Sequence, residues 1–159
     1  MVSVTLITLG TLKENYLKDA VSEYKKRLSQ YAKVEEINLK EEPIKNEDDP
    51  QEIKRALDTE GEKILSAFPK DSYKIAMCVE GKEYDSVGIS RLIGEASDLK
   101  GRLVFVIGSS HGLSEKVKMG CDARLSLSKL TFPHQLMRVI FYEMLYRSFT
   151  IIAGKKYHK

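Results

Sequence analysis

Two short loops in the last third of the chain carry side chains and backbone groups that could bind a small molecule. Residues 103–107 form an apolar run that ends in Gly-Ser-Ser-His-Gly at 108–112, and residues 125–128 lead into Lys-Leu-Thr-Phe-Pro-His at 129–134. Both loops follow predicted strands. Parallel α/β sheets bind ligands at the carboxyl ends of their strands. We therefore expect the two loops to form the two sides of one ligand site.

The charge of the chain is distributed unevenly. Residues 1–99 hold 15 lysine and arginine residues against 20 acidic ones, a net charge of −5, whereas residues 100–159 hold 11 against 3, a net charge of +8. A basic region beside a binding site favours a polyanionic substrate such as RNA. A solvated basic face without a partner is the alternative that composition leaves open.

The size of the chain predicts a single domain over residues 1–159. The 159 residues are 42% apolar and 31% charged, as expected for a soluble globular protein with a real core. No run reaches the roughly 20 apolar residues of a membrane span, and the first residues lack a signal-peptide pattern, so we expect a cytoplasmic protein without membrane contact. Cys78 and Cys121 suggest neither a disulfide framework nor a metal site, and we expect two buried free thiols.

Hydrophobic periodicity predicts strands alternating with helices. The expected strands are 2–9, 34–39, 73–79, 103–107 and 125–128, and the expected helices are 13–31, 50–67, one starting at Ser86, a short one after Ser114, and 133–150. Asp48 or Asp49, Ser86 and Ser114 are the predicted N-caps. This order predicts an α/β fold with a mostly parallel sheet and helices on both faces.

The last helix is apolar in nearly every direction. Its polar stripe consists of Gln135, Arg138, Tyr142 and Tyr146, flanked by Glu143 and Arg147. Such a helix cannot have one broad side in water, so either another part of the chain or a second copy must cover it. We expect a homodimer contact through this helix.

Two other classes of protein fit parts of the sequence. Residues 108–112 match G-x-S-x-G, the nucleophile pattern of serine hydrolases with Ser110 as nucleophile, but Leu113 and the capping Ser114 delay the following helix, and His134 or His158 would have to complete the triad. A dinucleotide-binding protein would carry a glycine-rich turn after its first strand, and only Gly10 stands there. We therefore disfavour both classes.

The motifs at residues 105–113 (FVIGSSHGL), 125–139 (LSLSKLTFPHQLMRV), 143–147 (EMLYR) and 157–159 (YHK) closely resemble the RlmH family. These are methyltransferases of the SPOUT superfamily that methylate N3 of a pseudouridine in 23S ribosomal RNA. The resemblance extends over essentially the whole chain. Ser109 stands where a second glycine is expected, and Met77 stands where leucine is expected.

The resemblance implies a C-terminal trefoil knot, a homodimer, and S-adenosylmethionine held by the knot loops, without a metal. The implied cofactor residues surround one apolar pocket: Met77, Gly108, Leu127, Ser128, Lys129, Leu130, Thr131 and Phe132. Gly108 would let the backbone approach the ligand closely, while Met77, Leu127 and Leu130 would sandwich the adenine. The implied substrate is ribosomal RNA, expected within the assembled ribosome.

Methylation of N3 requires that its imide proton be removed or its anion stabilised. The candidates are His158 and Tyr157 in the tail, Glu143, and the charges of Arg138 and Arg147. We expect the tail to fold over the site, in its own subunit or across the dimer, with Arg138 and Arg147 holding RNA.

Several residues in and near the predicted site could instead have purely structural roles. His134 suits a packing or capping role better than that of a base, Glu143 and Arg147 at i, i+4 could simply pair, and Ser128 and Thr131 could shape their loop. The non-enzymatic alternative is a ribosome-associated RNA-binding module that keeps the basic tail but does not bind S-adenosylmethionine.

Overall fold

The computed structural model describes residues 1–159 and contains a parallel sheet of five strands in the order β2-β1-β4-β3-β5. The strands are β1 (Val2–Leu9), β2 (Ala32–Leu39), β3 (Tyr73–Glu83), β4 (Arg102–Ile107) and β5 (Ala123–Ser126). Every pair of neighbouring strands is parallel. The predicted α/β class with a parallel sheet is therefore confirmed.

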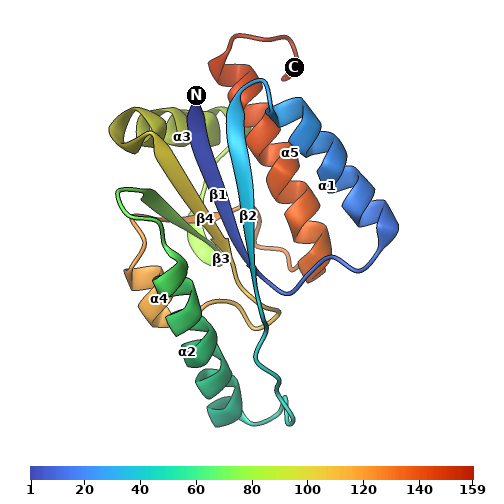
Figure 1. Ribbon diagram of the computed structural model, residues 1–159, viewed down its shortest axis with the longest axis vertical. Coiled ribbons are helices and arrows are strands. Elements are labelled where there is room, and N and C mark those ends of the chain that lie inside the picture. The colour runs from blue at the N-terminus through green and yellow to red at the C-terminus, as the bar shows by residue number, and fades with distance from the viewer.

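Helices cover both faces of this sheet (Figure 1). α1 (Asn15–Leu28), α3 (Ser86–Lys100) and α5 (His134–Ile152) pack on one face, while α2 (Pro50–Ala67) and α4 (Glu115–Met119) pack on the other. Helices α3 and α5 also contact each other, as do α1 and α5. The long, apolar α5 is thus partly covered within its own chain.

The strand sequences explain this layering, because successive side chains of a strand point to opposite faces. In β4, Leu103 and Phe105 pack towards α1, α3 and α5, while Val104 and Val106 pack towards α2 and α4. All four are fully buried. Complete burial of such a side chain contributes about 1.5–3 kcal/mol, so an apolar run with no polar face is what a doubly covered strand needs.

Several element boundaries differ from the predictions. Asp49 and Ser114 cap their helices as expected, but the cap of α3 is Asp85, whose carboxylate accepts a hydrogen bond from the Gly88 amide at 2.7 Å. The prediction of Ser86 was wrong because Ser86 is already the first helical residue. Similarly, β5 begins at Ala123, two residues earlier than expected, and ends at Ser126.

An irregularity in β3 shapes the carboxyl edge of the sheet. Both Met77 and Lys82 pair with Leu125 of β5, so residues 78–81 are displaced from the regular ladder. A Cβ on Gly81 would lie 2.7 Å from the Leu125 carbonyl carbon, and only glycine allows this approach. The strand therefore continues to Glu83, beyond its predicted end at residue 79.

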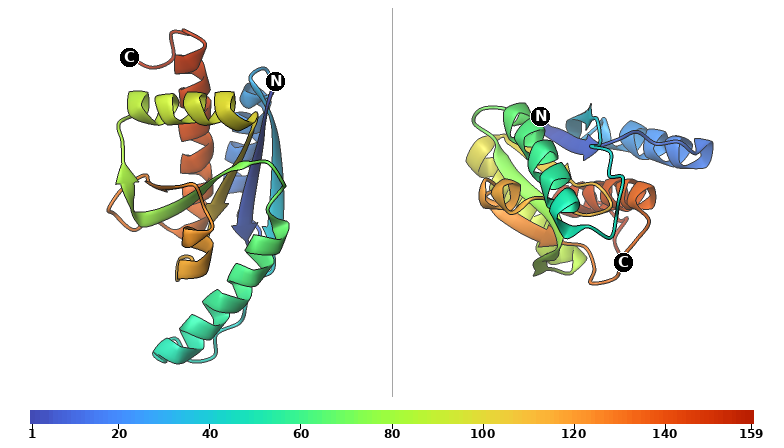
Figure 2. Two further views of the ribbon diagram at one scale, coloured as in Figure 1. Left: turned by 90° about the vertical axis from the view of Figure 1, so that its left-hand side faces the viewer. Right: turned by 90° about the horizontal axis from the view of Figure 1, so that it is seen from below.

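Helix α5 runs from one end of the molecule towards the other. It begins at the carboxyl edge of the sheet and runs back, so that the C-terminus lies at the same end of the molecule as the N-terminus (Figures 1 and 2). None of the helices combines the length and apolar character needed to cross a membrane.

Candidate functional site

A cavity of about 530 Å³, here called the edge cavity, lies at the carboxyl edge of the sheet. Three separate segments line it: the end of the regular part of β3, the loop after β4, and the segment between β5 and α5. Seven of the eight predicted cofactor residues are part of the lining, namely Met77, Gly108, Leu127, Ser128, Leu130, Thr131 and Phe132. Lys129 lies outside the lining. The structure thus brings together the two loops that the sequence singled out.

The walls of the edge cavity are largely apolar. Of the apolar residues in its lining, Met77 and Ile107 are buried, whereas Leu130 is 68% exposed. Such a surface suits a flat, weakly polar ring, which backbone N–H and C=O groups of the loops can identify at its edge.

Glycine is needed at position 108 for a different reason from the predicted one. A Cβ at this position would lie 2.2 Å from the carbonyl oxygen of Gly112, so the close approach is between two parts of the same loop. Gly112 has a φ of +88°, and its amide donates to the Ser109 carbonyl at 2.9 Å. The two glycines therefore fold residues 108–112 into a tight turn that forms one wall of the edge cavity.

Ser109, which replaces an expected glycine, takes an ordinary backbone conformation, since it is not among the residues with positive φ. Its hydroxyl donates to Oε1 of Glu60 at 3.0 Å, and the Glu42 amide donates to Oε2 of the same carboxylate at 3.0 Å. Glu60 is buried on α2, and burial raises its pKa. This buried carboxylate ties the turn at residues 108–112 to α2.

Ser128 shapes the second loop, as the structural interpretation of this residue predicted. Its hydroxyl accepts from the Leu130 amide at 2.9 Å, and its carbonyl accepts from the Ser126 hydroxyl at 3.0 Å. These contacts fix the path of the chain directly after β5. The backbone groups that face the edge cavity are thereby held in place before any ligand binds.

The rim of the edge cavity carries an ion pair and a thiol. Lys118 pairs with Glu80, and a hydrogen bond from Lys118 lowers the pKa of that carboxyl. Burial raises the pKa of the Cys78 thiol, and it raises that of Cys121 to about 11. Both cysteines are free thiols, as predicted, but they are only half-buried, so the prediction that they are buried was wrong. No cluster of three or more potential metal ligands occurs in the structure.

Ser110 does not have the surroundings of a hydrolytic nucleophile. It is exposed in the turn, and none of its hydrogen bonds joins it to a histidine. A nucleophilic serine needs a base within hydrogen-bond reach. The geometry thus agrees with the interpretation of Ser110 as a loop residue.

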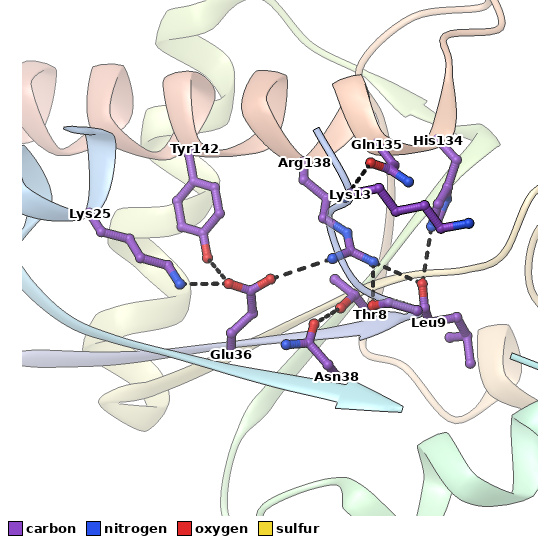
Figure 3. Close-up of polar contacts among 11 residues, drawn as sticks. Thr8, Leu9, Lys13, Lys25, Glu36, Asn38, His134, Gln135, Arg138 and Tyr142 are labelled. Atoms are coloured by element: carbon purple, nitrogen blue, oxygen red, sulfur yellow. Dashed lines mark hydrogen bonds and ion pairs between the residues drawn. The ribbon is translucent and has the colours of Figure 1, made fainter. Parts of the chain in front are cut away.

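Arg138 is buried, which corrects the expectation that it holds RNA. Its side chain is 1% exposed, and Nη2 donates to the carbonyls of Leu9 at 2.8 Å and Gly10 at 2.7 Å (Figure 3). Glu36 on β2 lies 3.8 Å from Nη1 and accepts a hydrogen bond from the fully buried Tyr142. The polar stripe of α5 therefore faces the sheet at these two positions, and Arg138 fastens the start of α5 to the end of β1.

The other four catalytic candidates form one group where the C-terminal tail packs against the second half of α5. Arg147 donates to Oε1 of Glu143 at 2.6 Å and lies over the Tyr157 ring, while the Tyr157 hydroxyl donates to Oε2 of Glu143 at 2.9 Å. Nη1 of Arg147 lies 3.4 Å from Nδ1 of His158. We call these four residues the tail cluster.

The tail cluster lies away from the edge cavity of the same chain. No member of it lines the cavity, and Arg147 is 13 positions after His134, about 20 Å along a helix axis. Burial and the adjacent Glu143 also raise the pKa of Tyr157, which keeps its phenol protonated. Within one chain, the predicted cofactor residues and the predicted catalytic residues are separate.

A second, more polar cavity of about 490 Å³ lies beside the edge cavity, and we call it the polar hollow. Its lining comes from the residues after β1 and β2 and from the start of α5: Leu9, Gly10, Thr11, Lys13, Asn38, Leu39, Lys40, Glu41, His134 and Gln135. The sequence analysis missed it. The signal was available, because Lys13 and Lys40 closely follow two predicted strands of a parallel sheet.

Comparison with known proteins defines the class of this parallel α/β protein. A family model described as "Predicted SPOUT methyltransferase" matches residues 2–158. The chain therefore belongs to the SPOUT methyltransferases, a family of enzymes that use S-adenosylmethionine.

Full-length relatives place the chain more narrowly among proteins named ribosomal RNA large subunit methyltransferase H. The protein of that name from Caldicellulosiruptor bescii is 44% identical over 156 residues, covering 98% of this chain and 99% of the relative. The one from Shouchella clausii is 41% identical over 158 residues, covering 99% of each. The resemblance to RlmH expected from the motifs is thus confirmed.

Among solved structures, the SpoU methyltransferase AviRb from Streptomyces viridochromogenes in complex with AdoMet aligns with a TM-score of 0.47 and 9% sequence identity. The alignment covers 96% of this chain and 58% of the length of that protein.

Proposed function

We propose that this protein transfers a methyl group from S-adenosylmethionine to N3 of a pseudouridine in 23S ribosomal RNA, in the cytoplasm and on the assembled ribosome. The observation that carries the proposal is the edge cavity, because seven of the eight residues implied by the family resemblance line it. The membership of the chain in the SPOUT methyltransferases and the names of its relatives support the same activity.

The edge cavity fits the methyl donor in size and chemistry. Its volume of about 530 Å³ lies within the usual range of small-molecule sites. Met77, Leu127 and Leu130 provide apolar contacts for adenine, and the turn at 108–112 and the loop at 128–132 provide backbone polar groups. When bound there, S-adenosylmethionine supplies an electrophilic methyl group on a positively charged sulfur.

The protein would accelerate the transfer mainly by positioning. Attack of the ring nitrogen on the methyl group joins an incipient anion with a cation, so apolar walls that exclude water do not oppose it. Holding the two groups in line and close together removes most of the entropic cost of their encounter. The hydrogen-bonded turns on both sides of the edge cavity supply the necessary rigidity.

A homodimer through α5 would bring the tail cluster to the edge cavity. Leu136 is 37% and Ile152 49% exposed, and Met137, Val139 and Ile140 between them are only half-buried. A second copy would cover these apolar side chains. The tail of one subunit would then reach the edge cavity of the other, with Arg147 and the tail lysines on RNA phosphates and Tyr157 as a stacking ring.

We also propose that residues 1–159 form one domain whose segment between β5 and α5 is threaded through a loop as a trefoil knot. The convergence of that segment, the turn after β4 and the displaced part of β3 on one cavity supports this path. The family resemblance is the other support.

Two measurements test the function. Isothermal titration calorimetry should detect S-adenosylmethionine binding, and tritiated methyl groups should be incorporated into 23S RNA of ribosomes prepared without this modification, with naked RNA as the comparison substrate. Absence of cofactor binding at millimolar concentration would favour the non-catalytic RNA-binding module. Light scattering that gives the mass of one 18.1 kDa chain would contradict the dimer.

A further inference from the structure

We propose that the polar hollow binds the imide edge of the target base and that Nδ1 of His134 receives the N3 proton. This inference rests on the proposed methyltransferase function and adds to it a base-binding site and a proton acceptor. It concerns residues outside both the tail cluster and the predicted cofactor set.

The position of His134 is the first argument. A proton acceptor for this reaction must border both the methyl donor and the nucleophile, because N3 loses its proton on the way to the bound methyl group. His134 is the one residue that lines both the edge cavity and the polar hollow. It stands at the first position of α5, where Pro133 and the fastened Arg138 limit its movement.

The hydrogen bond of His134 fixes its tautomer. Nε2 lies 3.1 Å from the Leu9 carbonyl oxygen (Figure 3). A carbonyl oxygen can only accept, so Nε2 must carry the hydrogen. In the neutral ring, Nδ1 then has a free lone pair, which is the form a general base needs. The Leu9 carbonyl is itself held by Arg138 at 2.8 Å, so the orienting group is fixed as well.

Beside the Glu41 carboxylate, which is an acceptor, the polar hollow presents several side-chain donors. Oδ1 of Asn38 accepts from the Thr8 hydroxyl at 2.6 Å, and Oε1 of Gln135 accepts from the Lys13 amide at 2.9 Å. The acceptor side of each amide is therefore engaged within the protein, which leaves each NH₂ group to donate. Lys13 and Lys40, for which the structure shows no ion pair with a carboxylate, add positive charge.

This pattern matches the imide edge of uracil and pseudouridine. That edge consists of two carbonyl oxygens on either side of the N3–H group. Amide and ammonium donors of the polar hollow would hold the carbonyls, and Nδ1 of His134 would face N3–H. The donors also stabilise the negative charge that develops on the carbonyl oxygens as the proton leaves.

The step balances without a further reactant. The N3–H bond breaks and the proton moves to Nδ1 of His134. The electron pair on N3 forms the bond to the methyl carbon, and the carbon–sulfur bond breaks with its electrons remaining on sulfur. The imidazolium afterwards releases its proton to water. The charged groups that line the two cavities are Lys13, Lys40 and Glu41 in the polar hollow and the paired Lys118 and Glu80 in the edge cavity. The other titratable groups near His134 are Arg138, one turn along α5, and His111 and the Cys78 thiol in the lining of the edge cavity.

Two substitutions separate the chemical role from a structural one. In His134→Gln, the side-chain NH₂ group can still donate to the Leu9 carbonyl, but no base remains. In His134→Asn, the side chain is also too short to reach that carbonyl. We expect both variants to lose about 100-fold or more in kcat on ribosomes at pH 7. If His134 only supported the packing, His134→Gln would retain activity and His134→Asn would not.

Two further readouts sharpen this test. The residual rate of His134→Gln should rise about tenfold per pH unit, because solvent must then generate the imide anion. Added imidazole should restore part of the activity of His134→Ala but none to His134→Gln, in which the space is filled.

Calorimetry should still detect S-adenosylmethionine binding by all three variants, which separates this proposal from the methyltransferase function itself. Activity of His134→Gln within threefold of the wild type would overturn the role of His134. Failure of the wild type to bind S-adenosylmethionine or to methylate RNA would instead overturn the proposed function.

Discussion

The two arginines of α5 carry the same charge on the same helix but have opposite surroundings. Arg138 is 1% exposed and bound to two backbone carbonyls of the β1 end, and burial lowers its pKa. The side chain of Arg147 is 30% exposed and paired with Glu143. The first holds the helix against the sheet beside the edge cavity, while the second belongs to the tail cluster. Their residue type indicated one role for both, and their burial distinguishes them.

The largest effect is expected from Arg138→Met. This change leaves the Leu9 and Gly10 carbonyls and the Glu36 carboxylate without their buried cation and should lower the free energy of unfolding by about 3–5 kcal/mol. Arg147→Met removes a partly exposed pair and should cost about 1 kcal/mol or less. Urea unfolding followed by circular dichroism measures both. Equal losses would show that burial does not distinguish the two arginines.

Gly108→Ala tests the wall of the edge cavity. The added Cβ would meet the Gly112 carbonyl oxygen, so the turn must open, and we expect S-adenosylmethionine affinity to fall about 100-fold or more. The matched control is Gly94→Ala in α3, where the nearest atom is 3.9 Å away. Because alanine is the better helix former, this control should keep its affinity and gain up to about 1 kcal/mol in stability. Calorimetry and urea unfolding report the two quantities.

Removal of residues 157–159 tests the other end of α5. The truncated chain should keep its cofactor affinity, since no tail residue lines the edge cavity, but should lose about tenfold or more in methylation of ribosomes. Full activity of the truncated protein would exclude the tail from the reaction.

Mixed dimers decide whether the tail acts across the subunits. Unfolding and refolding the truncated chain together with Gly108→Ala should restore about a quarter of wild-type activity, since half the dimers are mixed and each has one complete site. If the tail served its own subunit, mixing would restore nothing. Each variant refolded alone is the control.

The smallest effect concerns Glu60, which holds the turn at 108–112 through Ser109. Its pKa is raised in the folded state, so the fold binds this proton more tightly than the unfolded chain does. Stability from this group is therefore present at acidic pH and lost as pH rises above about 4.5. Glu60→Gln should remove that loss. The difference in unfolding free energy between this variant and the wild type should therefore change by about 1 kcal/mol or less from pH 4 to pH 7. A pH-independent difference would contradict it.

The sequence predicted most of the fold because nearby residues determine where most of the helices and strands begin and end. The β-branched run of β1, the Asp49–Pro50 start of α2 and the doubly apolar β4 each determine their element without distant partners. The continuation of β3 to Glu83 was missed because it depends on Gly81 packing against Leu125 of another strand.

The candidate site divides in the same way. The edge cavity could be located from two loops and the strand ends before them. The inward orientation of Arg138 and Tyr142 could not be predicted in this way. Helical periodicity groups polar residues into a stripe, but it does not show that Glu36 and the β1 carbonyls are their partners. The polar hollow also depends on segments more than 90 residues apart.

The attachment of Arg138 to Leu9 joins residues 129 positions apart, so the first strand and the last helix complete each other. During synthesis, β1 leaves the ribosome long before α5 has been made. A nascent chain therefore lacks both the wall contributed by α5 and the histidine orientation set by the Leu9 carbonyl. The protein becomes competent only after α5 has been synthesised and has packed against β1, and long-range closure of this kind is a slow folding step.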